Sequence, residues 1–192
     1  NAYNTAVGYN SGGAVTTGIN NTLIGAESGD AITDADHNTA VGFRSLSTNV
    51  LGSRSVALGA GSLFAQNPAA AADMYNVGIG YEAGVALTTG TLNTLIGGLA
   101  GDAITTGDWN VAVGKDALGA LVNGDYNVAI GGNALKLQNH SDGTDGWNVA
   151  VGQSAGAAIT TGVENTLIGG AAGDQLTTGD LNVKIGYNIQ ES

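Results

Sequence analysis

Residues 148–164 read NVAVGQSAGAAITTGVE, and variants of the same phrase fill the chain. Most copies start with Asn, continue with Thr or Val, a small or apolar residue, and Val, Ile or Leu, and then reach Gly. Steps of 17 residues separate the copies, except for two steps of 21 residues. A fixed period of this length predicts one small unit stacked on copies of itself, which is a solenoid. The eleven copies begin at Asn4, Asn21, Asn38, Ser55, Asn76, Asn93, Asn110, Asn127, Asn148, Asn165 and Asn182.

The residue types within one unit predict its local structure. The first five residues alternate as a strand does, with β-branched residues at positions 2 and 4 on one face. A small-residue corner follows at 153–156, and the apolar stretch 157–159 is expected to form a second, shorter strand. Thr-Thr-Gly at 160–162 predicts a turn whose Gly can take positive φ. The predicted fold is an all-β parallel β-solenoid of eleven 17- or 21-residue coils. The tripeptide recurs at 16–18, 88–90, 105–107 and 177–179.

Asn at position 1 of the coil predicts a structural ladder. Equivalent residues in stacked coils lie about 4.8 Å apart, a distance at which side-chain amides hydrogen-bond from coil to coil. We interpret these residues as structural and not catalytic, and Ser55 is the one departure. The ladder residues are Asn4, Asn21, Asn38, Asn76, Asn93, Asn110, Asn127, Asn148, Asn165 and Asn182.

A longer rhythm of four coils is superimposed on the repeat. Asn-Thr-Leu-Ile-Gly occurs at 21–25, 93–97 and 165–169, always 72 residues apart. Where position 9 changes from Gly to Leu, position 12 usually becomes polar, which suggests a fixed internal volume filled from alternate corners. The two 21-residue coils carry their extra residues in a turn, at 67–72 and 139–146. We expect both insertions to protrude on one edge, as binding loops or as decoration.

Composition excludes several function classes. A formal charge of −11 with only five Lys plus Arg argues against nucleic acid and anionic membranes as partners. The chain has no Cys, so it forms no disulfide framework, thiolate metal site or Cys nucleophile. It also lacks an apolar run of membrane-spanning length. We expect residues 1–192 to form a single repeat domain within a longer fibre polypeptide, because neither end carries an atypical capping unit.

The repeat resembles those of two groups of fibrous surface proteins. Asn127-Val128-Ala129-Ile130-Gly131 is similar to the head repeats of YadA-like trimeric autotransporter adhesins, and residues 4–9, Asn-Thr-Ala-Val-Gly-Tyr, are closer still to phage tail fibre repeats. The resemblance implies a left-handed β-roll, with three copies side by side forming a rigid shaft or an adhesive head. The residues themselves also favour association between copies, because a thin coil gains stability when a partner covers part of its outer face.

Aromatic residues directly before the repeated phrase are the main candidate site. Trp109, Tyr126 and Trp147 occupy this position in successive coils, and Tyr3 and Tyr75 occupy it elsewhere. The rings are expected either to pack in a seam between chains or to stack against the sugars of a cell-surface glycan.

Acidic and catalytic candidates are weaker. We expect the recurring carboxylates to be solvated turn residues, since Ca²⁺ needs six to eight oxygen ligands and the calcium-binding nonapeptide is absent. His140 with Asp142 and Asp145 is a still weaker metal candidate. No nucleophile elbow, phosphate loop or isolated carboxylate pair occurs, so no enzymatic activity and no cofactor are expected. The carboxylates considered are Asp30, Asp102 and Asp174 in Gly-Asp pairs and Asp108, Asp125 and Asp180 after a turn Gly.

The sequence therefore predicts a non-enzymatic structural shaft or receptor-binding segment of a trimeric fibre, located on a virion or extracellular surface. A bacterial adhesin head is the alternative. Paired Thr residues also leave open an ice-binding β-solenoid, although that array is interrupted at Thr33-Asp34, Thr48-Asn49 and Val122-Asn123.

Overall fold

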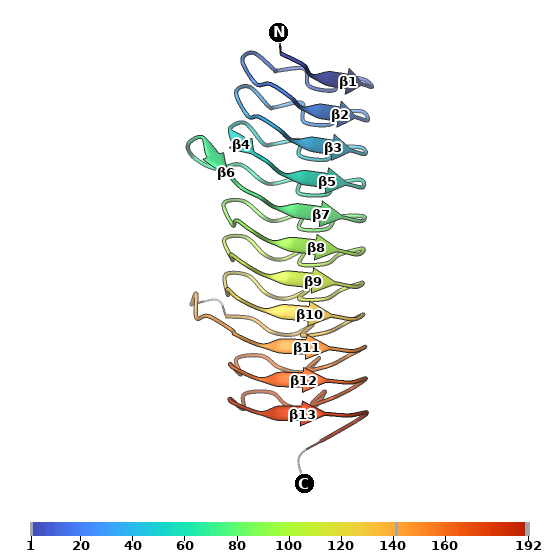
Figure 1. The fold of residues 1–192 in the computed structure, drawn as a ribbon, viewed down its shortest axis with the longest axis vertical. Helices are drawn as coiled ribbons and strands as arrows, with labels where there is room; N and C mark the ends of the chain where they lie inside the picture. Colours follow the sequence, from blue (N-terminus) through green and yellow to red (C-terminus); the bar gives the residue numbers. More distant parts are fainter. Residues whose placement is uncertain (1, 141, 191–192) are drawn as a thin grey trace.

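The protein is a parallel β-solenoid, as predicted. The computed structural model describes residues 2–140 and 142–190, and no helix occurs among them. Each coil contributes one three-residue strand to an 11-stranded parallel sheet, and strand neighbours follow chain order (Figure 1). The strands are β1 (Thr5–Val7), β2 (Thr22–Ile24), β3 (Thr39–Val41), β5 (Val56–Leu58), β7 (Val77–Ile79), β8 (Thr94–Ile96), β9 (Val111–Val113), β10 (Val128–Ile130), β11 (Val149–Val151), β12 (Thr166–Ile168) and β13 (Val183–Ile185).

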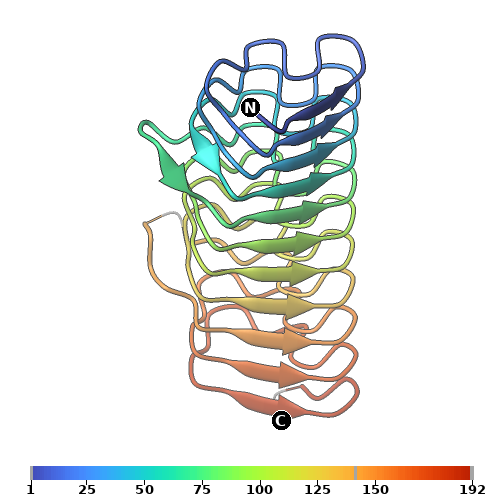
Figure 2. The same ribbon diagram turned by 45° about the horizontal axis from the view of Figure 1, so that its top comes forward.

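Register and winding follow directly from the period. Equivalent coil positions pair, for example Ala112 of β9 with Ala129 of β10. In Figure 1 the arrows cross the front of the stack from left to right while the chain descends, and Figure 2 shows the connections returning behind them. The coil is therefore left-handed.

The second strand expected in each coil is absent from the described residues. Residues 157–159 form turns, because the Ala157 N–H donates to Ser154 O over 3.2 Å and the Ile159 N–H donates to Gly156 O over 3.0 Å. The cause is the residue at position 9, which adopts left-handed φ (60° at Gly156) and interrupts an extended backbone. The segment consequently bends around the core in place of crossing it as a strand.

The prediction of positive φ at the Thr-Thr-Gly glycines is also wrong. None of the five has φ in the left-handed region, and Gly is required there for space: a Cβ on Gly90 would lie 2.4 Å from Gly107 O of the next coil. Besides position 9, positive φ occurs at the Gly of position 5, directly after each strand, where φ lies between 128° and 137° in all eleven coils. A Cβ on Gly114 would also lie 2.6 Å from the backbone of Gly131, so stacking itself demands Gly at this position.

The position-1 Asn side chains form a ladder inside the fold. The Asn110 N–H donates to Asn93 Oδ1 over 3.0 Å, and Asn93 Nδ2 donates to Gly107 O at the end of its own coil over 2.8 Å. Eight of the ten Asn side chains close their own coil in this way, whereas Asn127 Nδ2 and Asn182 Nδ2 donate to Oδ1 of the preceding Asn. Most of these side chains are fully buried, whereas Asn4 and Asn182 in the terminal coils are only half-buried.

Gln66 compensates for the one coil that lacks the Asn. Ser55 keeps its backbone bond to Asn38 Oδ1 at 2.9 Å, but its side chain is too short to reach the end of the coil. Gln66 Oε1 accepts from Ser55 Oγ at 3.2 Å and from Asn76 Nδ2 at 3.0 Å. In the other long coil, Gln138 Nε2 donates to Asn127 Oδ1 over 2.7 Å. Polar residues at position 12 therefore extend the ladder.

The core is narrow and changes composition along the stack. Leu46, Leu63, Leu118 and Leu135 at position 9 are fully buried, and three of these four coils have a polar side chain at position 12. Where position 9 is Gly, its space is taken by longer side chains, and a Cβ on Gly101 would lie 2.9 Å from Ile104 Cδ1. This exchange is the physical basis of the four-coil rhythm.

Both insertions project from the same edge, at the beginning of the strands, as expected (Figures 1 and 2). The first forms a small second sheet, in which β6 (Ala72–Asp73) pairs with β4 (Gly52–Ser53). The second spans 139–146, and its residue Ser141 lies outside the described part of the chain, as do residues 1 and 191–192 of the expected domain.

Candidate binding surface around the outer sheet face

The outward side of the eleven-stranded sheet is largely apolar, with Val, Ile or Leu at coil position 4 of every strand and Val or Thr at coil position 2. The middle residue of each strand, at position 3 of the coil, points into the core, as fully buried Ala112 and Ala129 do. The β-branched residues at positions 2 and 4 therefore face outward, and Ile24, Ile130 and Ile168 remain 38–39% exposed. We call the residues at coil positions 2 and 4, which are the first and last residues of each of the eleven strands, the outer sheet face. This face is the reverse of an ordinary amphipathic strand, whose larger apolar side chains point inward.

The residue before position 1 of each coil forms a row along the beginning of the strands, which we call the pre-strand row. All eleven members have left-handed φ, between 48° and 62°, although none is Gly. The backbone reverses here before entering the strand. Such a conformation costs on the order of 1–3 kcal/mol per residue, so the stacked structure on either side must hold it in place. The members are Tyr3, Asn20, His37, Arg54, Tyr75, Leu92, Trp109, Tyr126, Trp147, Glu164 and Leu181.

The predicted aromatic residues lie in this row at the surface of the single chain. Tyr75, Trp109 and Trp147 are 49–53% exposed, and Tyr126 is half-buried. Tyr126 and Trp147 stack with ring centroids 4.2 Å apart and planes 10° apart. Leu92 separates Tyr75 from Trp109 in the row. The result is a broad apolar patch over β9 to β11, beside the outer sheet face.

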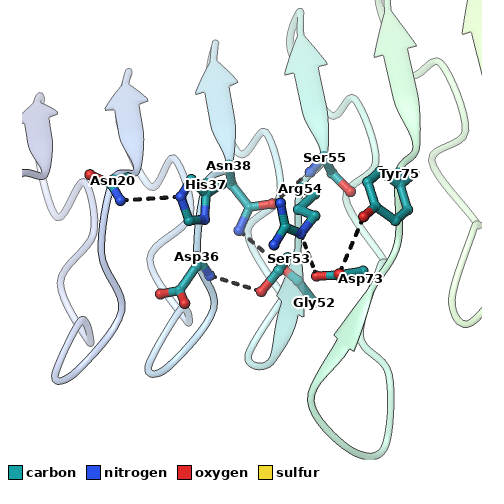
Figure 3. Close-up of polar contacts among 10 residues, drawn as sticks. All are labelled: Asn20, Asp36, His37, Asn38, Gly52, Ser53, Arg54, Ser55, Asp73 and Tyr75. Carbon is teal, nitrogen blue, oxygen red and sulfur yellow. Dashed lines mark hydrogen bonds and ion pairs between the residues drawn. The ribbon is translucent and has the colours of Figure 1, made fainter.

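Between Tyr3 and Tyr75 the same row is polar. Figure 3 shows Asn20, His37, Arg54 and Tyr75 in successive coils at the base of the strands. Asn20 Nδ2 lies 3.2 Å from His37 Nε2, and Arg54 Nε pairs with Asp73 of the first insertion at 2.8 Å. Asp73 also accepts from the Tyr75 hydroxyl at 3.3 Å. These contacts fasten the insertion to the row.

The recurring carboxylates cap backbone groups. Asp108 Oδ1 accepts from the Thr91 N–H at 2.6 Å, and Asp125 Oδ1 accepts from the Asp108 N–H at 2.7 Å. Burial and the neighbouring Asp108 charge raise the pKa of Asp125. Asp180 caps the Val163 N–H in the same way at 2.9 Å. These oxygens stabilise corners of the coil.

The Gly-Asp carboxylates and the His140 group are dispersed. Asp30 accepts from Ser47 Oγ at 2.6 Å, Asp174 contacts Gln190, and burial raises the pKa of Asp102. His140 is almost fully buried, which lowers its pKa, whereas Asp142 and Asp145 are exposed. Within 2–140 and 142–190, no three His, Cys, Asp or Glu side chains converge as metal ligands would.

The first Thr in four of the five Thr-Thr-Gly turns donates its hydroxyl within the fold. Thr88 Oγ1 donates to Thr105 O over 3.0 Å, and Thr105 Oγ1 donates to Val122 O over 3.2 Å. Thr16 and Thr160 make the same contact to the next coil. A flat array of free hydroxyls, which an ice-binding surface would need, is therefore not what the structure offers at these residues.

A second aromatic row, at position 6 beyond the other end of the strands, was not predicted from the sequence. Its aromatic members Tyr9, Phe43, Tyr81 and Tyr187 are 52–82% exposed. The signal was a two-coil alternation, because large residues at this position alternate with Ala or Gly along the whole chain. We call this the post-strand row. The outer sheet face is thus bordered by aromatic residues at both ends of the strands.

Comparisons of the chain with protein-family models, with curated proteins and with solved structures gave no match. A search for membrane spans found no sufficiently long, apolar helix among the described residues.

Proposed function

We propose that this protein is a non-enzymatic structural shaft or receptor-binding segment of a trimeric fibre. Three copies would lie side by side with their outer sheet faces inward, on a virion or extracellular surface, and mediate attachment to cell-surface glycan. The observation that carries the proposal is the outer sheet face, which presents Val, Ile or Leu at coil position 4 along the full stack.

The dimensions of this face favour association. Eleven strands at about 4.8 Å make a face about 50 Å long, and three residues at about 3.3 Å make it about 10 Å wide, or about 500 Å². A monomer rarely exposes a larger apolar patch. A stable interface needs about 800 Å² per partner, so the outer sheet face needs the adjoining pre-strand row to approach that area.

The pre-strand row belongs to this interface in the proposal. Trp109, Tyr126 and Trp147 extend the apolar surface beside β9 to β11 and are large enough to fill the space where two neighbouring copies diverge. Contact with glycan is the competing role for the same rings. Replacement of the rings distinguishes the two roles, because loss of assembly would indicate the interface and loss of cell binding would indicate the glycan site.

Lysine substitution of the outer sheet face tests the proposal. Ile96→Lys together with Val113→Lys should leave each coil intact, because both side chains point outward, but should bury two charges in the interface. We expect light scattering to show a single chain of 18.8 kDa in place of three, with an unchanged circular dichroism spectrum.

The matched control is Thr161→Lys in an exposed turn, which should leave the mass of the assembly unchanged. A lysine-substituted sheet face that still assembles as three chains would contradict the proposal. Release of reducing sugar from host polysaccharides by the native protein would contradict its non-enzymatic part.

A further inference from the structure

The post-strand row contains a slot with two aromatic walls. Phe43 and Tyr81 are two coils apart, about 10 Å along the stack, and Ala60 and Gly61 of the coil between them form the floor. Phe64 and Val85 complete an open cavity of about 340 Å³, a size typical of small-ligand sites. We call it the Phe43–Tyr81 slot.

Three departures from the repeat create this slot. Gly61 is at coil position 7, which carries a side chain in every other coil. Phe64 and Val85 are at position 10, where the other described coils have Gly, Ala, Ser, Asp or Lys. The corresponding cavity between Gln153 and Tyr187 has neither feature and is smaller, about 260 Å³. The apolar slot therefore belongs to one place in the stack and does not follow from coil geometry alone.

Its polar groups lie on opposite rims. Arg44 lines one side, where Glu27 holds its Nε at 2.5 Å and the guanidinium lies 5.1 Å from the Phe43 ring centroid. Glu82 lines the other side, and its carboxylate raises the pKa of the neighbouring Tyr81 hydroxyl. A paired donor, Arg44, and a carboxylate acceptor, Glu82, thus flank an apolar space lined by aromatic residues.

We propose that the Phe43–Tyr81 slot binds one neutral pyranose ring of a cell-surface glycan. The C–H faces of the sugar would pack on the two aromatic rings, while Arg44 donates to one hydroxyl and Glu82 accepts from another. A neutral sugar suits this rim better than an anionic one, because the Arg44 charge is already paired and the chain carries a net charge of −11. This inference rests on the proposed receptor-binding function and places the glycan site in the post-strand row.

Saturation-transfer NMR with methyl β-glucopyranoside and methyl β-galactopyranoside tests the slot, with phenylalanine amide as an aromatic probe. Gly61→Leu should fill the slot without disturbing the backbone, because Leu99 occupies the same coil position with φ of 59°. We expect the native protein to bind at least one glycoside and Gly61→Leu to bind it at least about tenfold more weakly, or about 1.4 kcal/mol. Tyr187→Ala removes a ring from the same row outside this slot and should bind as the native protein does.

Three results would overturn the slot assignment: no glycoside binding by the native protein, equal binding by Gly61→Leu, or binding of phenylalanine amide alone. Light scattering on the same samples separates this inference from the proposed function. A trimer that binds no glycoside overturns only the slot, whereas a monomer that binds glycoside in the slot overturns only the trimeric fibre. A Gly61→Leu protein that fails to assemble would show that the slot is a contact between copies, which also overturns the assignment.

Discussion

Removal of one internal Asn should destabilise the solenoid strongly and locally. In Asn110→Ala, the Gly124 carbonyl loses the Asn110 Nδ2 donor at 2.9 Å, and the Asn127 N–H loses the Asn110 Oδ1 acceptor at 3.0 Å. Both Gly124 and Asn127 are buried, so water has little access to the orphaned groups. An unsatisfied buried backbone group costs about 1–3 kcal/mol, so we expect a loss of about 4 kcal/mol.

Urea unfolding at fixed protein concentration measures the total effect, and hydrogen exchange of the Asn127 amide measures it at the site. Exchange there should accelerate by about three orders of magnitude, in proportion to the loss of about 4 kcal/mol. Asn182→Ala is the matched control, since its half-buried side chain donates to Asn165 Oδ1 and Asp180 O where water can replace it. We expect it to cost less than about 1 kcal/mol. Equal losses for the two variants would refute the ladder as a source of internal stability.

Three further changes test other parts of the structure. Gly114→Ala should cost at least about 3 kcal/mol in urea unfolding, because its Cβ would meet the next coil and its φ is 130°, whereas Gly98→Ala, with no atom within 4 Å of the added Cβ, should be nearly neutral; similar losses would count against close stacking. Replacing Trp109 and Trp147 by Ala should dissociate the assembly, at roughly 3–5 kcal/mol per buried Trp, and an intact trimer that no longer binds cells would move these rings to the glycan site. Burial lowers the pKa of His140, so the unfolded chain binds the proton more readily and stability should fall as pH drops below about 6.5; a melting temperature with the same pH dependence in His140→Gln would contradict this.

The period of the sequence determines much of the fold. Equal spacing of the Asn-containing phrase forces equivalent residues into adjacent coils, and from this follow the parallel register, the number of coils and the burial of Asn93 and Asn110. The exchange between Leu at position 9 and a polar residue at position 12 was also visible, because a solenoid core has constant cross-section.

Backbone conformation was less predictable. The left-handed φ at Leu118 and Leu135 replaced the expected second strand with turns, and it occurs at residues that rarely adopt it. Sequence propensity does not predict such φ values, because they are determined by the stacking of the coils and not by local turn residues. The Thr-Thr-Gly glycines were misassigned for a related reason: the close approach of the next coil, and not local φ, selects Gly there.

One candidate surface could be predicted from the sequence, and the other could not. The pre-strand aromatics share a coil position and were found by alignment of the repeat. The Phe43–Tyr81 slot draws on coil positions 6, 7 and 10 from three coils, so no single position identifies it. Phe64 and Val85 stand out only after stacking shows that they line one cavity.

The solution mass of the native protein tests the side-by-side assembly most directly. Light scattering coupled to size-exclusion chromatography should give one species at three times the 18.8 kDa chain mass, constant over a tenfold range of protein concentration. A constant mass of 18.8 kDa over that range would mean that the outer sheet face of this chain is stable in water, and would contradict the trimeric fibre.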